Sequence, residues 1–165
     1  MRKFVILCVD DERFVLSVIK EQLLRQFADT FVVETVESGE EALEVLAELE
    51  QDGNIVPVLI TDQMMPGMRG DELLLAVQAR SPRTRSILLT GQASMDVISA
   101  ALSAGRLYRY VAKPWRETDL LQTVRGALSS WREAQESGLF KGDDAAGVAQ
   151  VSDHAAGVTP PRSHR

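Results

Sequence analysis

The apolar residues of this chain follow two alternating patterns over its first 136 positions. Five short runs are continuously apolar and rich in branched residues, and between them apolar residues recur every three or four positions. Continuous apolar runs of this length are typical of strands that are covered on both faces. The predicted strands are residues 4–9, 31–35, 58–61, 87–90 and 107–112.

The segments between these runs have the spacing of amphipathic helices. The first is predicted to run from Glu12 and to bury a face made by Phe14, Val18, Leu23 and Phe27. The second follows Ser38, and Glu41 three residues later predicts a capping box at its start. The remaining predicted helices are residues 70–80, 94–104 and 117–136.

Five strands that alternate with five helices predict βαβ units and a parallel sheet. Right-handed crossovers favour an open, doubly wound sheet, so the predicted fold class is α/β. This domain is expected over residues 1–136. Residues 137–165 are dominated by Gly, Ala, Ser, Asp and Pro, and we expect them to be a disordered tail or linker.

Polar residues follow the apolar runs at the positions where a doubly wound sheet places its site. Asp10 and Asp11 come after the first predicted strand, Asp62 after the third, Thr90 at the end of the fourth and Lys113 after the fifth. The carboxyl ends of parallel strands meet at one edge, so three carboxylates are expected to converge there. Two such charges at ~4 Å repel by about 4 kcal/mol at an effective dielectric of ~20. Mg²⁺ removes this repulsion and prefers such oxygen ligands.

The overall composition narrows the possible chemistry. The net charge is −6, and the acidic excess lies before residue 137, which argues against direct binding to nucleic acid or to anionic membranes. Both histidines, His154 and His164, are in the expected tail, so the domain must act without imidazole. Cys8 is the single cysteine and is read as a core residue. No apolar stretch is long enough to span a membrane, and a cytoplasmic location is expected.

Four short segments resemble the receiver domain of bacterial two-component response regulators. They are Val9-Asp10-Asp11-Glu12, Thr61-Asp62-Gln63-Met64-Met65-Pro66-Gly67-Met68, Leu88-Leu89-Thr90-Gly91 and Tyr110-Val111-Ala112-Lys113-Pro114. The resemblance covers about residues 1–133. It implies a flavodoxin-like sheet of five parallel strands in the order 2-1-3-4-5.

The resemblance also implies a metal site and a phosphorylation site. Asp62 matches the phosphoacceptor. Asp11 matches a direct Mg²⁺ ligand, with Asp10 acting mainly through a bound water and the backbone carbonyl of Met64 as a third protein ligand. Asp62 itself also belongs to the implied metal set.

A phosphate-binding and switch set is implied in the same way. Thr90 and Tyr110 match the pair in which a hydroxyl moves toward the phosphoryl group and an aromatic ring turns inward. Gly91 and Lys113 match residues that contact the phosphoryl group, and the bond between Lys113 and Pro114 is expected to be cis. Met64 and Gln92 occupy positions that tune the lifetime of the phosphoryl group.

The implied partners are a sensor histidine kinase or phosphotransfer protein as donor, and a downstream protein or a second copy in a homodimer. The face of residues 94–104, 107–112 and 117–136 is expected to meet the latter. The domain accepts a phosphoryl group and releases it slowly, so it is not expected to be a turnover enzyme. Alternatives are an aspartate-nucleophile phosphohydrolase, a docking pseudo-receiver that is not phosphorylated, and a fragment of a larger regulator with a cyclic-dinucleotide phosphodiesterase or kinase output.

Several of these residues also have simpler structural interpretations. Asp10 and Asp11 are suited to capping a helix. Tyr108 is expected on the same face of its strand as Tyr110, which makes it the competing switch residue. Core packing is the preferred interpretation for Met64, Met65 and Met68, and packing or an interface for Trp115 and Trp131.

Overall fold

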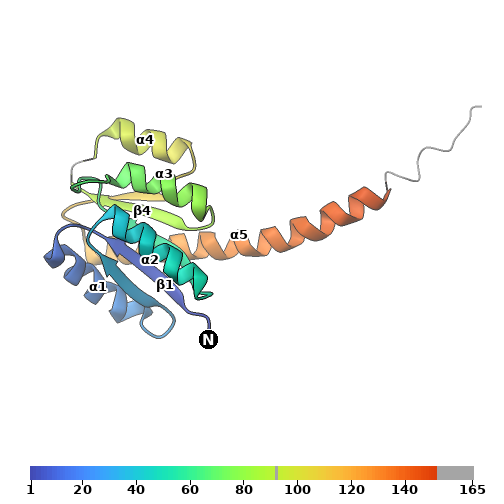
Figure 1. The fold of residues 1–165 in the computed structure, drawn as a ribbon, viewed down its shortest axis with the longest axis horizontal. Helices are drawn as coiled ribbons and strands as arrows, with labels where there is room; N and C mark the ends of the chain where they lie inside the picture. The colour runs from blue at the N-terminus through green and yellow to red at the C-terminus, as the bar shows by residue number, and fades with distance from the viewer. Residues whose placement is uncertain (92, 152–165) are drawn as a thin grey trace, which may run out of the picture. The chain divides into compact units, whose positions relative to one another are not determined.

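The computed structural model describes residues 1–91 and 93–151, with side chains described through residue 138. Strands and helices alternate along this part of the chain (Figure 1). The strands are β1 (Phe4–Val9), β2 (Val32–Val36), β3 (Ile55–Thr61), β4 (Arg85–Thr90) and β5 (Arg109–Ala112). The helices are α1 (Arg13–Phe27), α2 (Gly39–Gln51), α3 (Gly70–Arg80), α4 (Met95–Ser103) and α5 (Glu117–Val151). The chain divides into two units, Met1–Trp131 and Arg132–Arg165.

The five strands form one parallel sheet in the order β2-β1-β3-β4-β5. Val9 pairs with Val36 on one side and with Thr61 on the other, so β1, β2 and β3 end at the same level. Thr90 and Ala112, the last residues of β4 and β5, pair in the same way. The predicted fold class and strand order are therefore confirmed, and the residues that follow these strands share one edge.

Helices cover both faces of the sheet, which explains why the strands are continuously apolar. Alternate residues of β1 serve different layers: Ile6 and Cys8 face the cluster with α1 and α5, whereas Val5, Leu7 and Val9 face α2 and α3. A third cluster lies between β4, α3 and α4. Burial raises the pKa of Cys8 to about 12, in keeping with its interpretation as a core residue.

The predicted apolar face of α1 is only partly correct. Phe14 is 79% exposed, and the buried residues are Leu16, Ile19 and Leu23. Of the predicted residues, Leu23 is buried and Phe27 packs, partly buried, against the same cluster. The three buried residues are separated by three and four positions and form a single stripe, whereas Phe14 lies outside it. The large apolar side chain of Phe14 does not by itself imply burial. The orientation of α1 against the sheet decides which stripe of the helix is covered.

The helix starts agree with the capping signals in most respects. The Ser38 side chain accepts a hydrogen bond from the Glu41 N–H at 3.1 Å. The reciprocal bond of the predicted capping box differs, because the Glu41 carboxylate accepts the N–H of Glu37 rather than that of Ser38. Ser94 caps α4 by accepting the Val97 N–H at 3.3 Å.

Tyr108 and Tyr110 do not share a face, contrary to the prediction. Strand β5 begins at Arg109, so the alternation of a strand does not apply to Tyr108. Tyr108 packs on the cluster beneath α1 and α5, and its hydroxyl lies close to Gly126. Tyr110 packs on the opposite cluster with α3 and α4. Tyr108 is thereby removed as a competitor for the position beside Thr90.

Helix α5 continues beyond the predicted end of the domain at residue 136. Residues 137–151 of the expected tail belong to the same helix (Figure 1). Composition suggested disorder there, but extending an existing helix requires no new nucleation, and no proline occurs between Glu117 and Pro160. Residues 152–165 of the predicted tail lie outside the described residues. None of the described helices is sufficiently long and apolar to span a membrane.

Candidate functional site

A small hollow at the carboxyl-terminal edge of the sheet collects most of the predicted site residues. Its volume is about 220 Å³. The loops after β1, β3 and β5 and the end of β4 all contribute to it, as expected for a doubly wound sheet. The lining residues are Asp11, Glu12, Asp62, Met64, Thr90, Gly91 and Lys113.

Three carboxylates converge at this edge. Asp10, Asp11 and Asp62 each place one carboxylate oxygen within 4.8 Å of the others. Asp10 and Asp62 are 1% and 7% exposed, whereas Asp11 is exposed. Two buried acids and one open to solvent form an arrangement that a hard cation can enter from outside.

Lys113 holds the two buried carboxylates together. Its Nζ donates to Asp10 Oδ2 at 2.7 Å and to Asp62 Oδ2 at 3.2 Å. Burial alone lowers the pKa of Lys113, but the hydrogen bonds and charges of Asp10 and Asp62 outweigh burial and raise it. The lysine is therefore charged at neutral pH and partly offsets the two acids. The peptide bond that follows it, to Pro114, is cis, as the resemblance implies.

The burial of Asp10 works against its ionised form. Burial raises its pKa above the ordinary value, against the opposing effects of Lys113 and of the Glu12 N–H. The Glu12 N–H donates to Asp10 Oδ1 at 2.9 Å, so this acid also orders the turn before α1. The N-cap of α1 is Glu12, whose side chain makes no capping bond. The capping interpretation thus applies to Asp10 only in this indirect form.

The Asp62 carboxylate is held at both oxygens. Its Oδ1 accepts the N–H of Gln63 at 2.7 Å, and its Oδ2 faces Lys113. The Asp62 N–H donates to the Val9 carbonyl at 3.0 Å, which ties the start of the loop to β1. The carboxylate consequently has a defined orientation toward the hollow.

Thr90, at the end of β4, and Tyr110, within the neighbouring strand β5, are joined by a hydrogen bond. Thr90 is buried, and the Tyr110 hydroxyl donates to its backbone carbonyl at 3.1 Å. The Lys113 N–H donates to the same carbonyl at 3.2 Å. The predicted switch residues are therefore linked through the Thr90 backbone, with Gly91 exposed at the mouth of the hollow.

The predicted packing role holds for two of the three methionines. Met65 is buried and Met68 is half-buried, both in the cluster with α2 and α3. Met64 is 49% exposed and lines the hollow instead, so its assignment to the core is wrong. A loop residue that faces a site cannot be recognised from its side chain type. Gln92, predicted to tune lifetime, lies outside the described residues.

The donor set fits a hard divalent ion such as Mg²⁺. Carboxylates in small number, one of them open to solvent, match an ion that keeps several waters. The described side chains around the hollow include no histidine or cysteine, which zinc and copper prefer. The methionine sulfur of Met64 is a poor ligand for so hard an ion.

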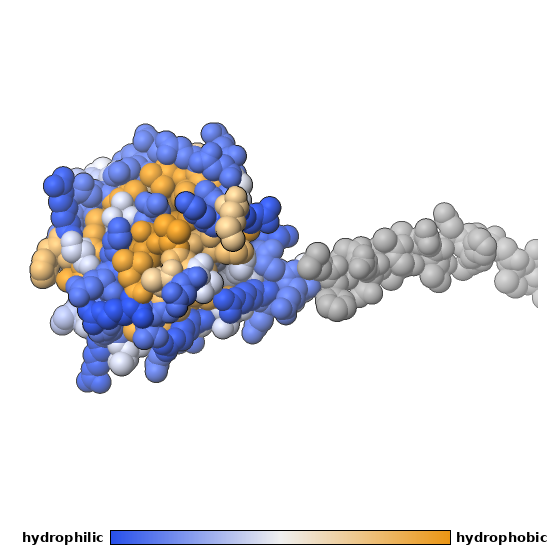
Figure 2. Space-filling model, turned by 90° about the horizontal axis from the view of Figure 1, so that it is seen from below, coloured by the Kyte–Doolittle hydropathy of each residue, from blue (hydrophilic) through white to orange (hydrophobic). Residues whose placement is uncertain are grey.

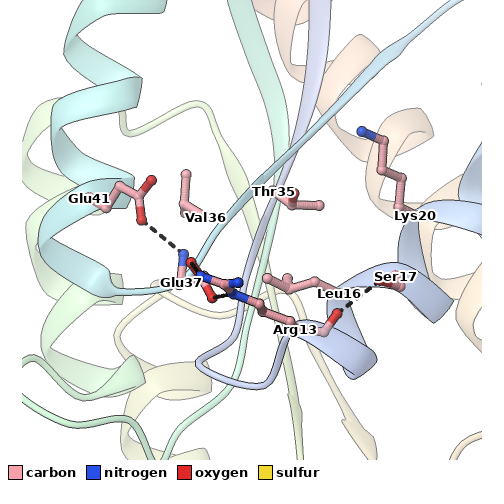
Figure 3. A pocket seen from close by; sticks show the side chains of 8 residues that line it. All are labelled: Arg13, Leu16, Ser17, Lys20, Thr35, Val36, Glu37 and Glu41. Atoms are coloured by element: carbon pink, nitrogen blue, oxygen red, sulfur yellow. Dashed lines mark hydrogen bonds and ion pairs between the residues drawn. The ribbon is translucent and has the colours of Figure 1, made fainter.

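A larger hollow lies elsewhere, between α1 and the edge strand β2, and has a volume of about 390 Å³. In Figure 3, the Arg13 side chain turns toward Glu37, with which it forms an ion pair, and Lys20 points away from that pair. The hydrogen bond and charge of Glu37 raise the pKa of Arg13. Charges paired across an open surface groove suggest structure rather than chemistry, so the smaller hollow is the stronger candidate.

Trp115 and Trp131 both pack within the domain. Trp115 donates through Nε1 to Gln22 at 2.8 Å and lies against the cluster beneath α1 and α5. The ring of Trp131 meets Phe4 edge-on, with centroids 5.8 Å apart. Figure 2 shows one face of the molecule, on which hydrophobic residues gather in the middle and hydrophilic residues surround them.

Two residues of the site were not predicted from the sequence. Glu12 lines the hollow, and Gln63 contacts the Asp62 carboxylate through its N–H. The sequence offers one signal for Gln63, its position directly after the strand-end acid. The residue is only 4% exposed, and this burial depends on the tertiary structure and cannot be read from the pattern.

The chain belongs to the response regulator receiver domain family, whose model matches residues 6–125. It is therefore a receiver domain of the two-component signalling class, as the four sequence segments suggested. Phosphorylation and magnesium binding are typical of this family.

Individual relatives agree with this assignment. The hydrogenase transcriptional regulatory protein HoxA of Cupriavidus necator is 34% identical over 129 residues, which cover 78% of this chain and 25% of that protein. This chain thus spans about a quarter of that relative's length. The receiver domain of an HD domain-containing protein from Pseudomonas fluorescens Pf-5 has a TM-score of 0.71 at 29% identity, covering 82% of this chain and 94% of that one. A receiver from Clostridium thermocellum has a TM-score of 0.69 at 30% identity, covering 79% and 98%.

Proposed function

We propose that this receiver domain is phosphorylated on Asp62 and that the modification switches a surface for protein–protein signalling. The proposal is carried by the position of the Asp62 carboxylate. It is buried just after the end of β3, and one of its oxygens lies within 4.8 Å of carboxylate oxygens of Asp10 and Asp11. Its Oδ2 lies 3.2 Å from Lys113 Nζ. Such a carboxylate is a nucleophile that needs no base, which suits a folded unit without histidine.

The proposed reaction transfers a phosphoryl group from a donor to Asp62. A carboxylate oxygen of Asp62 forms the bond to phosphorus while the bond between phosphorus and the donor's nitrogen or oxygen breaks. Lys113 supplies a fixed positive charge beside the incoming group, and the Thr90 hydroxyl offers a hydrogen bond to its oxygens. Positioning and charge account for most of the catalysis in reactions of this kind.

Asp10, Asp11, Asp62 and the backbone carbonyl of Met64 are the groups proposed to hold Mg²⁺. When bound, the ion offsets the negative charge of the transferring group. Asp11, as the exposed acid of the three, is proposed as a direct ligand. Asp10 is turned toward Lys113 and is proposed to act mainly through a water.

The signal is proposed to pass through Thr90 and Tyr110. Phosphorylation adds about −1.5 to −2 charges at Asp62. Lys113 and Thr90 are drawn toward that charge, and the Thr90 carbonyl accepts hydrogen bonds from the Lys113 N–H and from the Tyr110 hydroxyl. The Tyr110 ring packs beneath α4, so this movement biases the α4–β5–α5 face.

The proposed donor is a sensor histidine kinase or a phosphotransfer protein in the cytoplasm. The proposed receiver of the signal is a downstream protein or a second copy of this chain. Sustained hydrolysis is not proposed, because the position two residues after Asp62 is Met64, which supplies no second acid.

The test uses acetyl phosphate as donor, with and without Mg²⁺, on the wild type and on Asp62→Asn. Asp52→Asn is the matched control, because it makes the same chemical change at an exposed acid at the end of α2. We expect Mg²⁺-dependent label in the wild type and the control and none above background in Asp62→Asn. Label retained by Asp62→Asn at the wild-type level would overturn the assignment.

A further inference from the structure

The amino terminus of helix α3 is capped by a residue from outside the helix. Its own N-cap, Arg69, makes no side-chain capping bond. The first two N–H groups of the helix donate instead to Gln63: Gly70 to its backbone carbonyl at 2.9 Å and Asp71 to its side-chain Oε1 at 2.8 Å. Helix starts need such acceptors, because their first N–H groups have no partner within the helix.

Both ends of the Gln63 side-chain amide take part in this contact. Besides accepting the Asp71 N–H, its Nε2 donates to Asp71 Oδ1 at 2.8 Å. The residue is buried, so loss of either bond leaves a polar group without water to replace its partner. Asp71 thus meets Gln63 through two bonds in opposite directions, and this pair closes the β3–α3 loop into a ring.

The same residue orients the proposed phosphoacceptor. The Gln63 backbone N–H donates to Asp62 Oδ1, so a shift of the loop moves the Asp62 carboxylate. The ring is also tightly packed: a Cβ on Gly70 would lie 2.3 Å from the Asp62 carbonyl oxygen. Helix α3 and the phosphoacceptor are therefore in direct backbone contact at this point.

Met64 lies within the closed ring, immediately after Gln63. Its backbone carbonyl is the group proposed to bind Mg²⁺, and a carbonyl on an unconstrained loop would lose affinity to its own motion. The far side of the loop is tied separately, since the Glu40 carboxylate accepts the Met68 N–H at 2.9 Å. The Gln63–Asp71 pair is the tie nearer to the site.

We propose that Gln63 is a positioning residue for phosphoryl transfer. Its side-chain amide, bonded to Asp71, holds the Asp62 carboxylate and the Met64 carbonyl in fixed positions relative to each other. This inference rests on the proposed function, because it assigns a role within the same site. A cap that served stability alone would not change the affinity for Mg²⁺ in the folded protein.

The experiment compares four variants of the full chain. Gln63→Ala removes the clamp. Gln63→Glu keeps its size but sets two carboxylates against each other. Asp71→Asn retains the acceptor oxygen. The double variant Gln63→Glu/Asp71→Asn reverses the donor and the acceptor across the pair and restores the bond.

Two measurements are made on each folded variant: the Mg²⁺ dissociation constant by titration calorimetry, and the phosphorylation rate with acetyl phosphate at saturating Mg²⁺. We expect Gln63→Ala and Gln63→Glu to weaken Mg²⁺ binding by about tenfold or more, the scale of changes in residues behind metal ligands. Phosphorylation slows in parallel, Asp71→Asn stays near wild type, and the double variant recovers most of the loss of Gln63→Glu.

Two controls separate positioning from stability. Gln78→Ala removes an amide hydrogen bond from the same helix, to the Ala104 carbonyl and away from the site. Val77→Ala lowers stability through a buried position of α3. Both are expected to bind Mg²⁺ as the wild type does.

Wild-type Mg²⁺ affinity and rate in folded Gln63→Ala would overturn the inference, as would an equal loss in Val77→Ala or a double variant that recovers nothing. If Gln63→Ala does not fold, Gln63→Glu and the double variant carry the comparison, because they conserve volume. A wild type that takes no label would instead contradict the proposed function, and the Mg²⁺ titration would still be readable.

Discussion

At the residue scale, the site gathers charge that the fold does not favour. Asp10 is almost completely buried, and burial raises its pKa even though Lys113 lies 2.7 Å away. Binding sites commonly hold such strained ionised groups, because the arrangement serves a ligand rather than the fold. Among the described residues, no buried side-chain polar atom lacks a hydrogen-bond partner, and Asp10 is no exception.

Asp10→Asn is therefore expected to stabilise the metal-free domain. The folded pKa of Asp10 lies above its ordinary value of 3.8, so its ionised form opposes folding and stability is lost as pH rises through the folded pKa. We expect the free energy of unfolding at pH 7 to increase by about 1 kcal/mol, the scale of typical single substitutions. The gain should shrink between pH 7 and pH 4, because the raised pKa makes Asp10 take up its proton more readily as pH falls.

Urea unfolding in EDTA at the two pH values measures this effect. Asp52→Asn, an exposed acid, serves as the comparison and should change little. A loss of stability in Asp10→Asn at pH 7 would show that the bond to Lys113 outweighs burial.

At the element scale, the helices are placed by narrow apolar stripes. Leu16, Ile19 and Leu23 pack α1 against the sheet, while Phe14 is exposed to solvent. Helix α3 is fixed at its start by Gln63 from the preceding loop rather than by its own residues. The packing of an element and the capping of its end thus come from different parts of the chain.

Two substitutions in α1 test this placement. Leu23→Ala should lower the free energy of unfolding by about 2–5 kcal/mol, because it opens a cavity in the core. Phe14→Ser should change it by no more than about 0.5 kcal/mol, since the ring is exposed. Chemical denaturation of both variants compares them directly, and a large loss in Phe14→Ser would mean that the ring is covered in solution.

At the scale of the whole molecule, the domain is one parallel sheet whose carboxyl edge holds every component of the site. Strands β1, β3, β4 and β5 each deliver at least one of them, so the site exists only when these strands have assembled. A ligand bound at such a site stabilises the complete fold by mass action.

Mg²⁺ should accordingly raise the thermal stability of the domain. At about 100 times its dissociation constant, the expected gain is about 2.7 kcal/mol. Asp11→Asn should abolish most of this gain while leaving metal-free stability near wild type, because Asp11 is exposed. Calorimetric melting with Mg²⁺ or with EDTA gives the measurement, and an equal shift in Asp11→Asn would argue against this ligand assignment.

The amino-acid sequence by itself determined the fold class, the strand order implied by the resemblance and the edge at which Asp10, Asp11, Asp62, Thr90 and Lys113 meet. These follow from the spacing of apolar runs and from a general rule of parallel sheets, both of which are local or topological. It did not determine that Phe14 is exposed, that Tyr108 and Tyr110 face opposite layers or that α5 continues to Val151. Those outcomes, and the contact of Gln63 with Asp71, depend on how elements pack, and residues far apart in the chain decide them.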